Sequence, residues 1–106
     1  MQDISILYSP SNAREIHSWL AILNNECIGN VHLQIEPNKN IKLLDAWVHE
    51  NYRRQGVYRQ LWGTRWEFIQ QNYKDYKIYA WCKPMSLPLF IEKGFKSGET
   101  CVYVEK

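Results

Sequence analysis

The stretch that decides the fold reads VHENYRRQGVYRQL and spans residues 48–61. It connects an apolar run at residues 43–48 to a segment with helical spacing. Its middle carries Arg53, Arg54 and one glycine, Gly56. The first turn of a helix points unpaired N–H groups at the preceding loop, and the helix dipole favours an anion there. Arginines add charge and glycine permits close approach, so the stretch predicts a strand, a pyrophosphate-binding loop and a helix.

Further segments match a known pattern in their order and spacing around this loop. They read WLA at 19–21, IGNVHL at 28–33, LDAWV at 44–48 and FIEKGF at 90–95. Together with the basic loop they resemble the GNAT superfamily of N-acetyltransferases, over roughly residues 17–100. In that family an Arg/Gln-x-x-Gly-x-Gly/Ala loop holds the pyrophosphate of acetyl-coenzyme A, and a short helix ends in Gly-Phe. The resemblance therefore implies an acyltransferase of GNAT-like fold.

Length and composition bound the other possibilities. With 106 residues, 45% of them hydrophobic, the chain has enough material for one core, so residues 1–106 are expected to form a single acetyltransferase-like domain. The net charge of +2 gives no basis for nucleic-acid binding or for a basic membrane patch. There is no apolar run of about 18 residues and no signal-peptide pattern. We expect no membrane partner and a cytoplasmic location.

The apolar spacing predicts the order β-β-β-β-α-β-α-β, an α/β (α+β) fold with a mixed, mainly antiparallel sheet and helices packed on it. The expected strands are residues 4–8, 18–23, about 30–35, 43–48, 77–82 and 100–104, and the expected helices are residues 57–73 and 88–93. Asn24-Asn25 suits a tight hairpin turn, and Gly94 suits a helix cap. Gly63 inside the long helix suggests close approach of helix and sheet.

The resemblance also assigns donor-binding residues. In the family, the strand before the loop splays from its neighbour, and its amides contact the pantetheine arm and the thioester oxygen of acetyl-coenzyme A. That segment is Ala46, Trp47 and Val48 here, and the pyrophosphate loop is Arg53, Arg54, Gln55, Gly56, Val57 and Tyr58. Preorganised amides stabilise developing negative charge, which makes Ala46 a candidate catalytic residue. The asparagine that often begins the later helix is absent, and Ser86 is the nearest polar substitute.

Asp45 is the acid best placed to meet a primary amine acceptor, because the resemblance implies that its strand position faces the acceptor. It would hold the ammonium or receive its proton, whereas pairing with a lysine or plain solvation is an equally open interpretation. A second acidic position of the family aligns with Lys42, which cannot serve as a base. The tyrosine that often protonates the leaving thiolate aligns with Phe90, with Tyr79 as a possible substitute.

These departures keep two alternatives open. One is a catalytically degenerate module of the same fold that binds coenzyme A or a protein partner. The other, less favoured, is a small nucleic-acid-binding domain that uses Arg53, Arg54, Arg59 and Arg65.

The histidines and cysteines are given ordinary structural interpretations. His17 and His32 are expected on the surface of a hairpin and His49 at the start of a loop, without metal-ligand spacing, so no metal is predicted. The three cysteines, Cys27, Cys82 and Cys101, lie in strand-like runs and are expected to be buried thiols.

The acceptor is expected to be large or extended. Only residues 9–17 separate the first two predicted strands, which leaves little chain to enclose a small molecule. Trp47, Tyr79 and Trp81 could contact a partner surface instead. A second copy of the chain that completes a closed pocket, as a homodimer, is the alternative.

Overall fold

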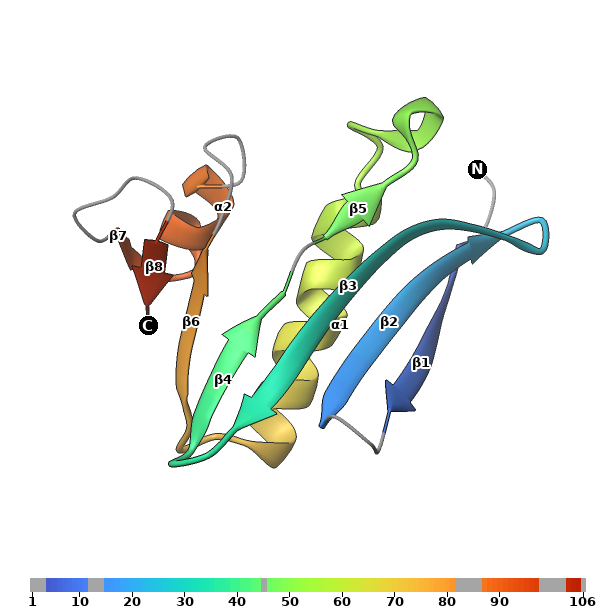
Figure 1. The fold of residues 1–106 in the computed structure, drawn as a ribbon. Coiled ribbons are helices and arrows are strands. Elements are labelled where there is room, and N and C mark those ends of the chain that lie inside the picture. The colour runs from blue at the N-terminus through green and yellow to red at the C-terminus, as the bar shows by residue number, and fades with distance from the viewer. Residues whose placement is uncertain (1–3, 12–14, 45, 82–86, 98–102, 106) are drawn as a thin grey trace.

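The computed structural model describes residues 4–11, 15–44, 46–81, 87–97 and 103–105. Their elements follow in the order β1 (Ser5–Ser11), β2 (Ile16–Leu23), β3 (Glu26–Glu36), β4 (Asn40–Leu43), β5 (Trp47–Val48), the 3-10 turn η1 (Glu50–Tyr52), α1 (Val57–Asn72), β6 (Lys77–Trp81), α2 (Leu87–Glu92), β7 (Lys96–Ser97) and β8 (Tyr103–Glu105). Figure 1 shows these strands as one sheet with α1 lying behind its centre. The predicted mixed α/β architecture is confirmed.

The sheet has the strand order β1-β2-β3-β4-β6-β8-β7, with β5 paired to β3 beyond the end of β4. The β4–β6 pair is parallel, and the other described pairs are antiparallel. Asn24 and Asn25 form the β2–β3 turn with φ of 51° and 65°, the left-handed backbone that a two-residue hairpin requires. That part of the prediction is confirmed, although β2 begins at Ile16, earlier than expected.

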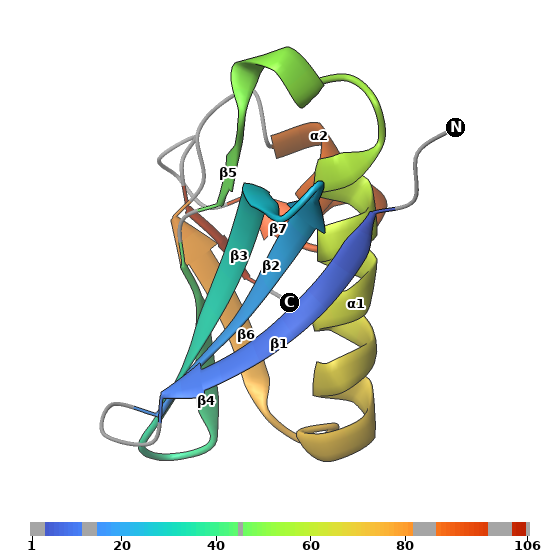
Figure 2. The same cartoon turned by 90° about the vertical axis from the view of Figure 1, so that its right-hand side faces the viewer.

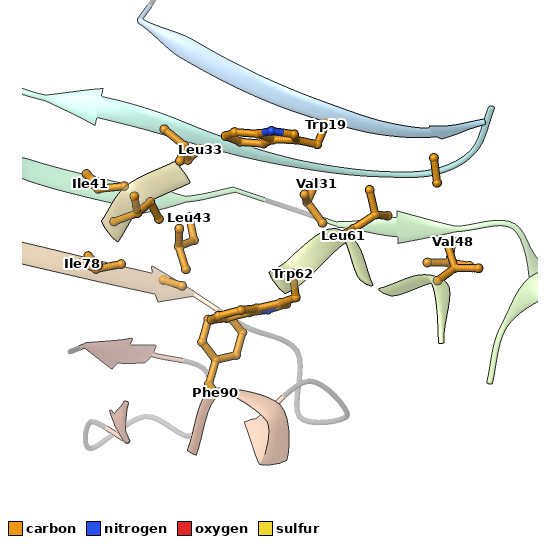
Figure 3. Packing of buried hydrophobic residues seen from close by; sticks show 14 of the residues in the cluster. Trp19, Val31, Leu33, Ile41, Leu43, Val48, Leu61, Trp62, Ile78 and Phe90 are labelled. Carbon is orange, nitrogen blue, oxygen red and sulfur yellow. The ribbon is translucent and has the colours of Figure 1, made fainter. Parts of the chain in front are cut away.

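One layer of helix covers one face of the sheet. Figure 2 shows α1 along that face, and the alternation of strand side chains places Val31, Leu33, Ile41 and Leu43 against it. Figure 3 shows these residues packed with Leu61 and Trp62 of α1 and with Phe90 of α2. The full buried cluster is Trp19, Ala21, Leu23, Ile28, Val31, Leu33, Ile41, Leu43, Val48, Val57, Leu61, Trp62, Ile69, Ile78, Ala80, Phe90 and Phe95.

The helix α1 buries a stripe that the sequence predicted only in part. Its fully buried side chains include Leu61, Trp62, Ile69 and also Arg65, which is 1% exposed. Arg65 lies four residues from both Leu61 and Ile69, so it occupies a core position. Gly63 corrects a second expectation: it is exposed, and a Cβ built on it would meet nothing within 4 Å. It does not mark a close approach of helix and sheet.

The end of α2 confirms the predicted cap. Gly94 has φ of 92°, its N–H donates to the carbonyl of Ile91, and the N–H of Phe95 donates to the carbonyl of Phe90. These two bonds form a Schellman motif, which only a left-handed residue such as glycine closes without strain. The rings of Phe90 and Phe95 meet edge to face at 5.1 Å, and both contact Trp62. The cap therefore anchors α2 to α1.

Cys27 differs from its expectation. It lies in β3 but is exposed, and its thiol donates to the carbonyl of Gly29. Cys82 and Cys101 lie outside the described residues.

Candidate active site

The predicted strand over residues 43–48 is wrong in one respect: the structure divides it into β4 and β5. The Leu44 N–H donates to the carbonyl of His32, and further along Trp47 pairs with Asn30. Trp47 is therefore three residues after Leu44, whereas their partners on β3, Asn30 and His32, are only two residues apart. One extra residue on one strand of a pair is the signature of a β-bulge. A bulge bends its strand, and here it ends the contact with β6, whose ladder with β4 stops at Ala80.

The break leaves one backbone donor of β5 directed at the gap between β5 and β6. The His49 N–H donates to the Ile28 carbonyl at 2.7 Å, and Gly29 pairs with Val48. Antiparallel pairs alternate between hydrogen-bonded and non-hydrogen-bonded, so Val48 directs its N–H and carbonyl away from β3. Its carbonyl accepts a bond from Nε of Arg53 at 3.0 Å. The N–H of Val48 is therefore positioned to donate into the opening.

Gly29 allows β5 to lie this close to β3. A Cβ built on Gly29 would lie 3.0 Å from the carbonyl oxygen of Trp47, 3.2 Å from Cδ1 of Leu61 and 3.4 Å from Cγ2 of Val48. The first of these neighbours is backbone and cannot turn aside. Only glycine permits this spacing, so Gly29 sets the position of the β5 amides.

The basic loop that follows β5 is organised by its own hydrogen bonds. Nδ1 of His49 accepts from the N–H of Asn51, and Nε2 of Gln55 donates to the Asn51 carbonyl. The Arg53 bond to Val48 ties the loop to β5. His49 was expected to begin a loop, and it does so as the cap of the 3-10 turn.

The loop ends at the N-terminus of α1 with two residues in left-handed conformation, Arg54 (φ 64°) and Gly56 (φ 85°). Gly56 is the cap residue and provides no side-chain bond to the first turn, which contains no acidic residue. Residues 53–56 are exposed. The first-turn N–H groups and the helix dipole therefore act at an exposed loop to which Arg53 and Arg54 add positive charge, and this combination favours an anion such as a pyrophosphate.

A cavity of about 440 Å³ lies where β4, β5 and β6 diverge. Its described lining comprises Asn30, His32, Lys42, Leu43, Leu44, Ala46, Trp47 and Trp81. The side chains of Asn30, His32 and Lys42 alternate with the core residues of their strands, so they face away from α1. Trp47 and Trp81 remain 43% and 54% exposed at its margins. Polar groups thus meet aromatic surface beside the gap.

His32 is held within this cavity and is not a plain surface residue, which corrects its expected role. Its Nδ1 lies 2.7 Å from Oγ of Ser18, and its Nε2 lies 3.1 Å from Oδ1 of Asn30. Because an amide oxygen only accepts, the bond to Asn30 puts a proton on Nε2 and leaves Nδ1 facing the Ser18 hydroxyl. The ring is therefore fixed on both sides in a half-buried position.

One sequence signal could have indicated His32: it alternates with Val31 and Leu33 and so lies on the face of β3 away from the core. What a single strand could not show is that β4, β5 and β6 bring Lys42, Trp47 and Trp81 to the same cavity. This convergence depends on pairing between distant segments.

Arg65 lies beneath this region on the α1 side. Its Nη1 donates to the His32 carbonyl at 3.0 Å, and its guanidinium lies 5.0 Å from the Trp62 ring centroid. Burial lowers the pKa of Arg65 to about 10, against the opposing effect of the nearby Tyr58 hydroxyl. Arg65 therefore stays cationic near neutral pH and holds the His32 carbonyl, beside the bulge, from the α1 side of the sheet. It is not available on the surface, contrary to its part in the nucleic-acid hypothesis.

Comparison with known proteins identifies the family of the chain. The model of the acetyltransferase (GNAT) family matches residues 3–95, most of the chain. The chain belongs to the GNAT acetyltransferase family. No curated protein matches its sequence.

Solved structures share the fold of this GNAT domain at low sequence identity. The GNAT family N-acetyltransferase YhbS from Escherichia coli, solved in complex with coenzyme A, has a TM-score of 0.77 at 13% identity, over 99% of this chain and 81% of its own. An IAA acetyltransferase from Bacillus cereus has a TM-score of 0.73 at 15% identity, over 92% and 79%. A putative streptothricin acetyltransferase from Bacillus anthracis, in complex with acetyl coenzyme A, has a TM-score of 0.67 at 16% identity, over 97% and 82%. These likenesses confirm the predicted fold.

Other residues singled out from the sequence are distributed as follows. Ala46 and Trp47 line the cavity, the Val48 side chain is buried in the core, and the loop from Arg53 to Tyr58 follows β5. Asp45 and Ser86 lie outside the described residues. Phe90 is buried against Trp62. The Tyr79 hydroxyl donates to both carboxylate oxygens of Glu36, at 2.8 and 2.9 Å, and Tyr79 is not among the described residues that line the cavity.

Two features are not found among the residues that the structure describes. No three His, Cys, Asp or Glu side chains in this part of the chain converge as metal ligands would. None of its helices is long and apolar enough to cross a membrane.

Proposed function

We propose that this GNAT domain transfers the acetyl group of acetyl-coenzyme A to a primary amine by direct attack of the amine on the thioester. The observation that supports this most is the continuity of three features. An anion-binding loop at the start of α1, an outward N–H on Val48 and a polar cavity lie in sequence along one broken strand.

The donor would bind along β5. Its pyrophosphate would accept bonds from the first-turn N–H groups of α1, with Arg53 and Arg54 supplying charge and Gly56 allowing close approach. Its arm would follow the gap toward Ala46 and Trp47. The Val48 N–H would donate to the thioester oxygen, where negative charge develops as the amine attacks.

The acceptor would approach from the cavity side of the sheet. Its ammonium must lose a proton before the nitrogen can form a bond to the thioester carbon, and Lys42 is a cation that cannot accept one. His32 is a described cavity residue that can accept it by a relay: the Ser18 hydroxyl, 2.7 Å from Nδ1, would take the ammonium proton as it gives its own proton to Nδ1. Asp45 remains the second candidate, as an ammonium-binding or proton-accepting carboxylate.

The leaving thiolate takes a proton from solvent in this proposal. As the nitrogen–carbon bond forms, the carbon–sulfur bond breaks, and the sulfur retains the electron pair. Phe90 has no acidic group, and the Tyr79 hydroxyl already donates to Glu36. The open margin between Trp47 and Trp81 gives water access to the cavity.

Thermal melting with acetyl-coenzyme A tests the donor site. A ligand at a hundredfold excess over its dissociation constant adds about 2.7 kcal/mol to the unfolding free energy, which corresponds to a rise in Tm of roughly 10 °C for a chain of this size. Gly56→Val should abolish that rise, because a β-branched residue is strained at φ of 85°. Gly56→Asn is the matched control, since asparagine tolerates left-handed backbone and keeps the unliganded fold.

The outcomes separate the rival functions. Release of free thiol with an amine panel, on top of the Tm rise, supports the transferase. A Tm rise with no thiol release from any amine favours the degenerate coenzyme A-binding module. An unchanged Tm at saturating ligand contradicts both, and salt-dependent retention of an oligonucleotide would then favour nucleic-acid binding.

A further inference from the structure

Lys42 places a cation inside the proposed acceptor cavity. It lies on β4 between Ile41 and Leu43, which are buried in the core, so its own side chain emerges on the cavity face. It is half-buried and makes no ion pair with any residue that the structure describes. Among the residues that the structure describes, no carboxylate neutralises Lys42, so its charge is placed to bind an anion.

The anion that Lys42 would bind is not the pyrophosphate of the donor. Lys42 pairs with Gln34 of β3, whereas Val48, which precedes the basic loop, pairs with Gly29 of the same strand. Five residues of extended chain separate these two positions, roughly 17 Å. The phosphate loop lies farther still, beyond Val48. Lys42 therefore lies at the opposite end of the site from the proposed pyrophosphate position.

Lys42 and His32 lie close enough to contact one small molecule together. His32 is two residues from Gln34 on the same face of β3, which makes it the diagonal neighbour of Lys42, at a Cα separation of about 7–8 Å. Both side chains line the same cavity. An ammonium-derived nitrogen at His32 and an anion at Lys42 would therefore be only a few bonds apart in the bound molecule.

We infer that the acceptor is an α-amino acid, whose carboxylate is bound by Lys42 while its amino group faces His32 and the thioester. This inference rests on the proposed function and specifies its substrate class. The side chain of the amino acid would lie between Trp47 and Trp81, which present exposed aromatic surface at the margins of the cavity. The volume of about 440 Å³ is within the range of small-molecule sites.

The same charge disfavours the acceptors expected from the sequence. A polyamine or a lysine-rich peptide would bring a further cation toward Lys42, and like charges in a partly desolvated site repel. A protein N-terminus has no α-carboxylate to pair with Lys42. The charge of Lys42 thus favours a small acceptor that carries a carboxylate over a large or extended one.

Matched amine pairs test the inference. Phenylalanine and phenethylamine, and leucine and isopentylamine, differ only in the carboxylate. Thiol release with acetyl-coenzyme A should give the parent protein a kcat/KM for each amino acid at least tenfold above that for its decarboxylated partner. In Lys42→Gln this ratio should fall about tenfold, mainly through KM, and in Lys42→Glu it should invert. Dividing the two rates within each variant removes the general effect of the substitution on catalysis.

Lys74→Glu is the charge control, because Lys74 is exposed after α1 and changes the net charge equally. It should leave the ratio unchanged. Equal ratios in the parent and both Lys42 variants, or a parent preference for polyamines or lysine peptides, would overturn the inference while leaving acetyl transfer intact.

If the protein binds acetyl-coenzyme A but releases no thiol, a binding measurement tests the inference instead. Calorimetric titration of N-acetyl-leucine and N-isopentylacetamide into the coenzyme A-saturated protein should show at least tenfold tighter binding of the former, and Lys42→Gln should remove the difference. Absence of that preference overturns the inference. Absence of a Tm rise with acetyl-coenzyme A instead overturns the proposed function, so the two failures are distinct.

Discussion

Replacing Gly29 by alanine should destabilise the fold and weaken the donor site together. The new Cβ would lie 3.0 Å from the carbonyl oxygen of Trp47, so β5 must move away from β3 by a few tenths of an ångström. Overpacking of this kind costs about 1–3 kcal/mol. Part of this cost is offset, because alanine lowers the conformational entropy of the unfolded chain and thereby stabilises the fold by about 0.4–1 kcal/mol. The net loss in unfolding free energy is therefore about 1–2 kcal/mol, a fall in Tm of roughly 5–10 °C.

Gly63→Ala is the matched control, since it is the same substitution in an exposed helix interior with nothing within 4 Å of the new Cβ. It should raise the unfolding free energy by about 1 kcal/mol, because glycine is that much less favourable than alanine in a helix. Urea unfolding of the three proteins gives the free energies, and calorimetric titration with acetyl-coenzyme A gives the affinities. Gly29→Ala should bind the donor less tightly, and Gly63→Ala should bind it as the parent does.

A Gly29→Ala variant that matches the parent in both stability and donor affinity would refute this prediction, because β5 would then tolerate displacement without consequence. Loss of stability with unchanged affinity would refute only the connection between Gly29 and the Val48 amide.

Two further predictions concern acid sensitivity and the acceptor side. Burial lowers the pKa of His17, against the opposing effect of Glu15, so the unfolded chain takes up its proton at a higher pH than the folded one. The neutral imidazole of His17 contributes its full stability above about pH 6.5, and this contribution is lost as the pH falls through the lower pKa of the folded state. Between about pH 8 and about pH 5, the Tm of His17→Gln should therefore fall less steeply than the Tm of the parent. Asp45→Asn should lower turnover with an amine by at least about tenfold while the affinity for acetyl-coenzyme A stays nearly unchanged, and equal thiol release by mutant and parent would return Asp45 to a structural role.

The family and most of the order of elements could be predicted from the sequence because they depend on local signals, although the division of residues 43–48 and the short strand β7 were not expected. A basic loop with one glycine, the helical spacing after it and the Gly94 cap each arise from short stretches of chain, and the backbone conformations observed at Gly56 and Gly94 agree with them. The hairpin turn at Asn24 and Asn25 is equally local.

The bulge could not be predicted in this way. Residues 43–48 form one apolar run, and its division into β4 and β5 is visible only through the register of β3, where Asn30 faces Trp47 and His32 faces Leu44. Register is a relation between two strands, so a single strand does not contain it.

A GNAT domain with a basic, glycine-containing loop at the start of its long helix follows from the sequence alone, because capping, turn and periodicity signals are short-range and additive along the chain. Tertiary structure alone decided that Arg65 is buried, that Gly29 fixes the β5 amides, and that His32 and Lys42 share one cavity. Residues on different strands become neighbours only when the sheet assembles around α1. Their common chemistry therefore depends on packing between segments far apart in the chain.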